Sequence, residues 1–221
     1  MKKHGCNRSI TYEELENIPL PPARKRFVPL AHKDLFDMTA HNLSMLDYKI
    51  KDPKFLVDHT QQKFIATFGL TNDRLEQHEQ YEFQLGLLGS NDSTMAHKLF
   101  TGLRTMMCDN GQWDGEVVIS RRHTKNAVFD VNSGLRDFVF NLADIQKKTF
   151  ASQEKLREYD FSSQSEVHDF VVETGNQNII PWQHAPHVLE HWNNPEHPEF
   201  EERNGYCLYN AYTSHFRTIN Q

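Results

Sequence analysis

The sequence predicts an α+β protein, with a mostly antiparallel sheet in the N-terminal half and helices from the C-terminal half covering it. Short β-rich runs separated by polar turns fill the first half, and helical stripes of apolar residues fill the second. A chain of 221 residues is long enough for one sizeable core. We therefore expect a single domain over residues 1–221. Its expected parts are N-terminal helices and an arm (1–52), a sheet core (53–131) and a helical, acidic cover (132–221).

Two helices are expected at the start of the chain. Thr11 to Glu14 reads as a capping box, in which the Thr and Glu side chains accept backbone N–H groups that the helix leaves unbonded. The helix that it opens must end before Pro19, because the residue before a proline disfavours the helical conformation. Apolar residues at near-helical spacing predict a second, amphipathic helix over 34–46.

Strands are expected next, because the following runs are rich in β-branched and aromatic residues and are separated by polar breaks. Residues 95–107 fit a helix or a strand interrupted by Gly102, and we favour the strand. The expected strands are 54–57, 63–70, 81–88, 95–107 and 115–121.

Helices are expected in the rest of the chain. An apolar stripe from Leu135 to Ile145 predicts a helix that continues past Leu156. Ser163 and Glu166 form a second capping box, which opens another helix. Two further short helices are expected over 185–192 and 206–216.

A hairpin with a basic end is the most informative local feature. Asn110-Gly111 is a strong turn signal, because both residues tolerate the positive φ that a type I′ turn requires. We expect Cys108, Asn110 and Gly111 to form the turn between two strands. The second strand then ends in a group of basic residues, Arg121, Arg122, His123 and Lys125.

Three blocks of sequence around this hairpin resemble a family of phage- and plasmid-type proteins that is catalogued as domain of unknown function 932. The middle block runs from Gly102 through Cys108-Asp-Asn-Gly to Arg121-Arg-His-Thr, similar to that family's Arg-x-x-x-Cys-x-Asn and Arg-x-His-Thr elements. The others are Gln84-Leu-Gly-Leu-Leu-Gly-Ser-Asn-Asp-Ser and, from Gly205 to His215, GYCLYNAYTSH. The resemblance implies a phage or plasmid origin and no established reaction.

The basic residues of the hairpin are typical of a surface that binds phosphate. Arginine pairs with phosphate in a bidentate manner, histidine or lysine adds a donor, and an aromatic ring can stack on an unpaired base. The alternative is a solvated strand end whose arginines pair with Asp109, Asp114 and Glu116. The candidate nucleic-acid-binding residues are Arg104, Trp113, Arg121, Arg122, His123 and Lys125.

Charge is distributed unevenly. The net charge is −6, but residues 152–221 carry 4 Lys or Arg against 11 Asp or Glu, whereas residues 1–33 carry 7 against 3. Nucleic-acid binding over the whole surface is therefore excluded, since it needs a basic domain, and binding by a local basic strip is allowed.

Two groups of residues have the types and spacing of a catalytic or metal site, and each also has a structural interpretation. Cys108 with His123 as its base would suit a hydrolase, but the thiol follows an apolar run, where a buried cysteine is commoner. His184, His187 and His191 are spaced to share one helix face, as a metal site requires, but an exposed histidine-rich face is the simpler interpretation. We expect no catalytic residue, no metal and no cofactor.

The leading hypothesis is an accessory protein of phage or plasmid nucleic-acid metabolism that binds single-stranded DNA for recombination, annealing or replication, in a homo-oligomer. The alternative is a protein–protein module that inhibits or redirects a host factor through its acidic region, and the hydrolase is a second alternative. Three widely spaced cysteines and the lack of an apolar run near 20 residues predict a protein of the host cytoplasm without membrane contact.

Overall fold

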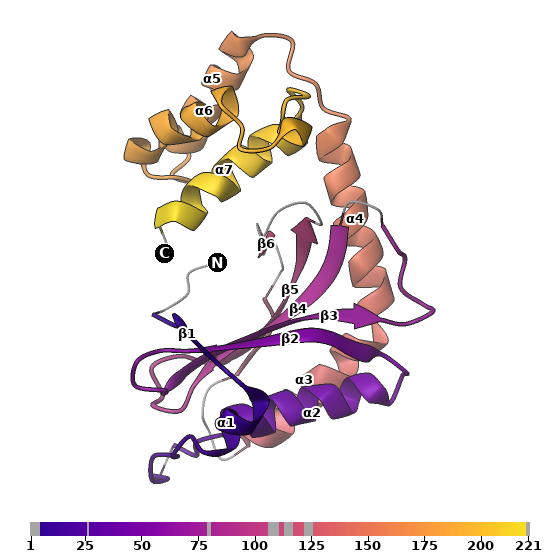
Figure 1. Cartoon of the computed structure of the whole chain (residues 1–221), viewed down its shortest axis with the longest axis vertical. Coiled ribbons are helices and arrows are strands. Elements are labelled where there is room, and N and C mark those ends of the chain that lie inside the picture. The colour runs from indigo at the N-terminus through magenta and orange to yellow at the C-terminus, as the bar shows by residue number, and fades with distance from the viewer. Residues whose placement is uncertain are drawn as a thin grey trace. The chain divides into compact units, whose positions relative to one another are not determined.

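The computed structural model describes residues 5–25, 27–78, 81–105, 111–112, 117–121 and 126–219 (Figure 1). Only the backbone is described for 104–105, 111–112, 117–121, 127 and 217–219. The chain divides into two compact units, residues 1–146 and 147–221, and the division falls within helix α4 (Leu142–Arg157). The expectation of one domain, with parts 1–52, 53–131 and 132–221, stays a prediction.

The first unit is built on an antiparallel sheet, which confirms the predicted fold class. Strands β1 to β5 pair in chain order, and β6 and β7 pair with different segments of β5. Every pairing among the described strands is antiparallel. The strands are β1 (Arg8–Ile10), β2 (Lys49–Val57), β3 (Lys63–Thr71), β4 (Tyr81–Ser90), β5 (His97–Thr105), β6 (Gly111–Gln112) and β7 (Val117–Arg121).

Helices α2 (His32–Ser44) and α3 (Ala127–Phe140) cover one face of this sheet (Figure 1). The ring of Phe36 in α2 lies 4.9 Å from that of Phe55 in β2 and 5.7 Å from that of Phe68 in β3. Leu135 of α3 is buried. This face forms the main core, because large apolar side chains from three elements meet on it.

The predicted capping box at the start of the chain is confirmed. Helix α1 (Tyr12–Glu16) begins after Thr11, whose Oγ1 accepts a bond from the Glu14 N–H at 3.3 Å. In return, Glu14 Oε2 accepts the Thr11 N–H at 2.7 Å. Residues 95–107 contain a strand, as predicted.

Strands β1 and β6 were not predicted, and two predicted elements differ from the structure. Strand β2 begins at Lys49 rather than at residue 54, because a bulge between Lys51 and Lys54, with φ of 47° at Asp52, carries the pairing across Pro53. The helix predicted to run from Leu135 past Leu156 is two helices, α3 and α4, separated at Asn141.

The second unit is helical. Its elements after α4 are α5 (Gln164–Asn176), η1 (Trp182–His184), α6 (Ala185–Asn193), η2 (Pro198–Phe200) and α7 (Gly205–Ile219). Val171, Val188 and Leu208 bury their side chains between α5, α6 and α7. Ser163 caps α5 as predicted, but Glu166 Oε2 accepts the N–H of Ser162 at 2.7 Å instead of completing the box.

None of the helices in the described part of the chain is both long enough and apolar enough to span a membrane.

Candidate nucleic-acid interface

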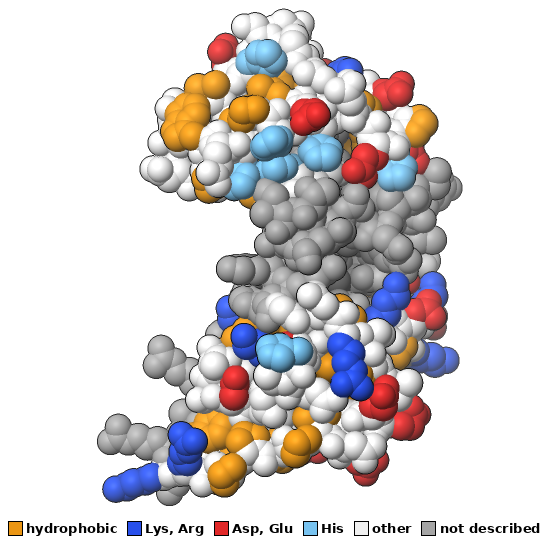
Figure 2. Space-filling model, turned by 60° about the vertical axis from the view of Figure 1, so that its left-hand side comes forward, with side chains coloured by type: hydrophobic (Ala, Val, Ile, Leu, Met, Phe, Trp, Pro, Cys, Tyr) orange, Lys and Arg blue, Asp and Glu red, His pale blue; other side chains and the backbone are white. Residues whose placement is uncertain are grey.

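Five lysines lie on the sheet face that points away from α2 and α3. We call Lys49, Lys51, Lys54, Lys63 and Lys98 the lysine face. Their strand partners are Thr71, Gly69, Thr67, Ser90 and Leu88. These partners alternate along β3 and β4 with residues buried on the helix-covered face, and neighbouring side chains in a strand point to opposite faces. Lys and Arg side chains are exposed on this unit in Figure 2.

A glutamate lies within the lysine face. Glu82 Oε1 is 3.3 Å from Lys51 Nζ, and its Oε2 accepts a hydrogen bond from Gln84 Nε2 at 3.0 Å. The Glu82 side chain is 16% exposed and that of Lys51 is 51% exposed, so the pair is partly shielded from water. Gly69 makes room for it, since a Cβ there would lie 2.6 Å from Glu82 Oε1.

The lysine face is wide enough for a polymeric anion. Lys54 is on β2 and Lys98 is on β5, with β3 and β4 between them. At roughly 4.8 Å between neighbouring strands, and with an offset of two residues at roughly 3.3 Å each, the backbones of these two positions are about 16 Å apart. A single phosphate cannot contact lysines so far apart, whereas a chain of phosphates can.

An apolar group covers one end of the same face. Cys6, Ile65, Leu88 and Phe100 form a small buried cluster there. Burial, with a smaller contribution from the nearby Asp58 carboxylate, raises the pKa of the Cys6 thiol to about 11. Burial also raises the pKa of the Cys207 thiol in the second unit. Both thiols therefore stay protonated near neutral pH and are structural.

Two of the residues predicted to bind nucleic acid lie at opposite ends of β5. The backbone of Arg104 pairs with Glu82 and Gly111, and that of Arg121 pairs with His97. His97 and Arg104 are seven residues apart, so the two positions are separated by about 23 Å at roughly 3.3 Å per residue. Gly111, which we expected within the turn, is the first residue of β6, and its backbone pairs with that of Arg104. The other predicted residues, Trp113, Arg122, His123, Lys125, Cys108 and Asn110, lie outside the described residues.

The three histidines weighed as a metal site do come together, and they are joined by a fourth. His215 of α7 lies with its ring centroid 5.0 Å from that of His184, 5.2 Å from His187 and 6.1 Å from His191. His215 was not predicted as a member of this group, because it is 31 residues from His184 along the chain and lies on another helix. Within the described ranges, no group of three or more His, Cys, Asp or Glu residues is arranged to hold a metal ion.

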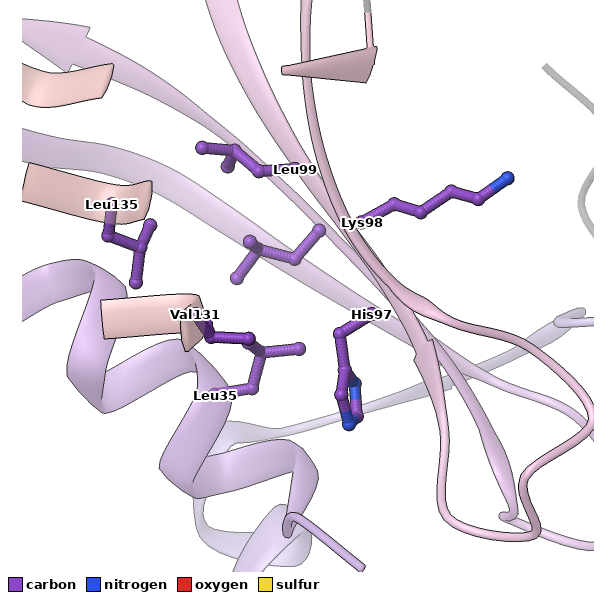
Figure 3. A pocket seen from close by; sticks show the side chains of 7 residues that line it. Leu35, His97, Lys98, Leu99, Val131 and Leu135 are labelled. Carbon is purple, nitrogen blue, oxygen red and sulfur yellow. The ribbon is translucent and has the colours of Figure 1, made fainter. Parts of the chain in front are cut away.

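A small pocket lies on the helix-covered side of the sheet, between α2, α3 and β5 (Figure 3). Leu35, His97, Leu99, Val131 and Leu135 are among the residues that line it. Its volume is about 10 Å³, which is room for roughly one water molecule. The pocket is too small for an organic substrate. Lys98 points away from the other labelled side chains in Figure 3.

Comparison of the chain with protein-family models, with curated proteins and with solved structures finds no match. The resemblance to the phage- and plasmid-type family stays a prediction.

Proposed function

We propose that the protein binds single-stranded nucleic acid across the lysine face of its sheet. The observation that carries the proposal is the placement of five lysines from three strands on one sheet face, with Glu82 of β4 among them. Of the predicted hairpin residues, Arg104 would add to the lysine face, because its backbone pairs with that of Glu82, whereas Arg121 pairs with His97 of the helix-covered face. Arg122 and Lys125 stay predictions. The biological setting that we propose is recombination, annealing or replication of phage or plasmid DNA in a host cytoplasm, by a homo-oligomer.

Electrostatic attraction would supply most of the affinity. Each phosphate that a lysine neutralises releases a bound counterion from the nucleic acid, and this release favours binding without reading the base sequence. Single-stranded nucleic acid is favoured over a duplex because its flexible backbone can follow the surface of a twisted β-sheet. In addition, Trp113 would offer a ring on which an unpaired base can stack.

The test compares two triple variants that remove the same charge. Lys49→Gln/Lys54→Gln/Lys98→Gln neutralises the lysine face and leaves Lys51 paired with Glu82. Lys147→Gln/Lys148→Gln/Lys155→Gln neutralises three exposed lysines of α4 in the second unit. Binding of a fluorescein-labelled 30-nucleotide oligo-dT is followed by fluorescence anisotropy in 50 mM salt.

We expect the lysine-face variant to lose at least about tenfold in affinity, because three phosphate contacts are removed. The α4 variant should bind as the unmodified protein does, within a factor of about two. Equal losses in the two variants would show that only net charge matters, and no binding by the unmodified protein would end the proposal.

A second candidate function is a protein–protein module, and the surface of the second unit favours it. Residues 147–221 carry 6 Lys or Arg against 11 Asp or Glu. Phe170, Ile179 and Trp182 are large apolar residues there whose exposed fractions are 48%, 65% and 53%. Exposed apolar side chains beside acidic ones are typical of a surface that meets a basic protein. A host protein retained from nuclease-treated lysate by the full chain, and lost with Ile179→Ser/Trp182→Ser, would support this candidate.

A further inference from the structure

Four imidazoles meet where α6 packs against α7. We call His184, His187, His191 and His215 the histidine cluster. The spacings of three and four residues place the first three on the α6 side of this contact, and His215 reaches them from α7. Histidine side chains gather on the surface of the second unit in Figure 2.

His215 is the buried member of the histidine cluster. It is 5% exposed, and its Nε2 lies 2.9 Å from His184 Nδ1, so one of these two nitrogens donates and the other accepts. If both rings carried two protons, both nitrogens would be donors and the bond would be lost. His187 stacks on His215 with an angle of 13° between the ring planes, which places another titratable ring against it.

The neighbours of His215 oppose its protonation. Burial is the largest cause, and repulsion from His184, His187 and His191 adds to it, so that the pKa of His215 is lowered to about 4. On α6, Glu190 lies 3.7 Å from His187 Nδ1 and thus next to an outer member of the cluster.

Among the contacts described, the other elements packed against α7 contribute one charged group, the guanidinium of Arg157 in α4, which lies 4.0 Å from the ring centroid of Tyr206 at the start of α7. The rest are neutral. From α5, the Thr174 hydroxyl bonds to that of Tyr212 at 2.9 Å. From η2, the contacts are the backbone carbonyl of Glu199, which accepts from Cys207, and the ring of Phe200, which lies against Tyr206.

We propose that the histidine cluster is an acid-sensitive contact, which holds α7 against α6 while the buried imidazole of His215 is neutral and loosens when that imidazole is protonated. In the unfolded chain, histidine titrates near 6.5. Because the folded pKa of His215 lies below that value, its contribution to stability is complete above pH 6.5 and is lost as the pH falls toward 4.

The size of the effect follows from these two values. Between pH 7.5 and pH 5.0 this one group should raise the unfolding equilibrium constant about 30-fold, since each pH unit in the titrating range is worth roughly tenfold. The loosening should begin in the second unit, which contains Trp182 and Trp192. Trp192 is buried beside α5 and therefore reports the packing there.

The experiment is urea unfolding of the full chain at pH 7.5 and pH 5.0, followed by tryptophan fluorescence and far-UV circular dichroism. His215→Gln removes the titrating ring but keeps a side chain that can bond to His184. His187→Gln/His191→Gln removes two neighbours that are less buried than His215, and it serves if His215→Gln does not fold. His41→Gln/His59→Gln is the control, since both of these histidines are exposed in the first unit.

Between pH 7.5 and pH 5.0, the rise in the unfolding equilibrium constant should be at least about tenfold smaller in His215→Gln than in the unmodified chain. The rise should also be reduced in His187→Gln/His191→Gln. The control should lose as much stability as the unmodified chain. If His215→Gln, or the double variant where His215→Gln does not fold, shows the same pH dependence as the unmodified chain, the proposal is overturned.

Discussion

Glu82 is the residue that most directly limits the charge of the lysine face. It neutralises Lys51 at 3.3 Å, and its contact with Gln84 fixes the carboxylate in place. Because the Lys51 end of the pair is half exposed, the pair contributes little to stability, and it can be changed without unfolding the sheet. The effect of Glu82 on the binding of an anion should be larger than its effect on stability, because the carboxylate repels phosphate across a partly shielded surface.

Glu82→Gln should therefore bind oligo-dT more tightly than the unmodified chain, by about threefold to tenfold in 50 mM salt. The substitution keeps an acceptor for Gln84 and frees the charge of Lys51. Fluorescence anisotropy measures the effect, and Glu158→Gln, an exposed position directly after α4, is the control with the same change of charge. Weaker binding by Glu82→Gln would mean that the anion does not approach this face.

Two glycines of the sheet should respond differently to the addition of a methyl group. A Cβ at Gly86 would lie 2.1 Å from the ring of Phe100, which is buried and cannot move aside. A Cβ at Gly69 would meet the carboxylate end of Glu82, which can rotate away. We expect Gly86→Ala to cost about 1–3 kcal/mol in the free energy of unfolding and Gly69→Ala to cost less than about 1 kcal/mol. Urea unfolding measures both, and equal costs would contradict this account of the packing.

Among the elements, α4 shows how a loop is held to the sheet unit. Gln146, at the end of the first unit, is buried and bonds to both backbone groups of Glu76, accepting its N–H at 2.8 Å and donating to its carbonyl at 3.0 Å. The loop between β3 and β4 is thereby tied to a helix that is 70 residues away along the chain.

Gln146→Leu should reduce the free energy of unfolding by about 1–2 kcal/mol, because two hydrogen bonds to a partly buried backbone are lost. Hydrogen exchange at the Glu76 amide should increase at the same time. Gln177→Leu, at the exposed end of α5, is the control and should change stability by less than about 0.5 kcal/mol. An unprotected Glu76 amide in the unmodified chain would argue against this contact.

Most elements could be predicted from the sequence, because their local signals agree with the fold. Thr11 and Glu14 marked a helix start, and β-branched and aromatic runs marked β3, β4 and β5. The start of β2 was missed because Asp52 and Pro53 resemble a turn. Residues 49–54 of β2 lie beyond the part that pairs with β1, so a bulge with a proline is tolerated there. The break at Asn141 was missed because the apolar stripe continues across it.

The candidate site was less predictable than the elements. The sequence predicted a site at the basic residues around Arg121, because a run of consecutive basic residues can be identified without knowledge of the fold. The lysine face is assembled from β2, β3 and β5, so its lysines are separated by up to 49 positions and become neighbours only through strand register. The same reason hid His215, whose partners lie on another helix.

At the scale of the whole molecule, the two units differ in charge. Residues 1–146 carry 18 Lys or Arg against 19 Asp or Glu, whereas residues 147–221 carry 6 against 11. A nearly neutral unit can still bind a polyanion where its lysines share one face, and the acidic unit should avoid one. We therefore expect the phosphate contacts on the first unit and the acid-sensitive contact on the second.

The most direct test of phosphate binding by the lysine face is the salt dependence of oligo-dT binding. For single strands, the slope of log K against log salt concentration is roughly −0.7 for each phosphate neutralised. Lys49→Gln/Lys54→Gln/Lys98→Gln should make this slope less negative by about 2, and Lys147→Gln/Lys148→Gln/Lys155→Gln should leave it unchanged. A slope that is the same in the unmodified chain and the lysine-face variant would contradict phosphate binding at this face.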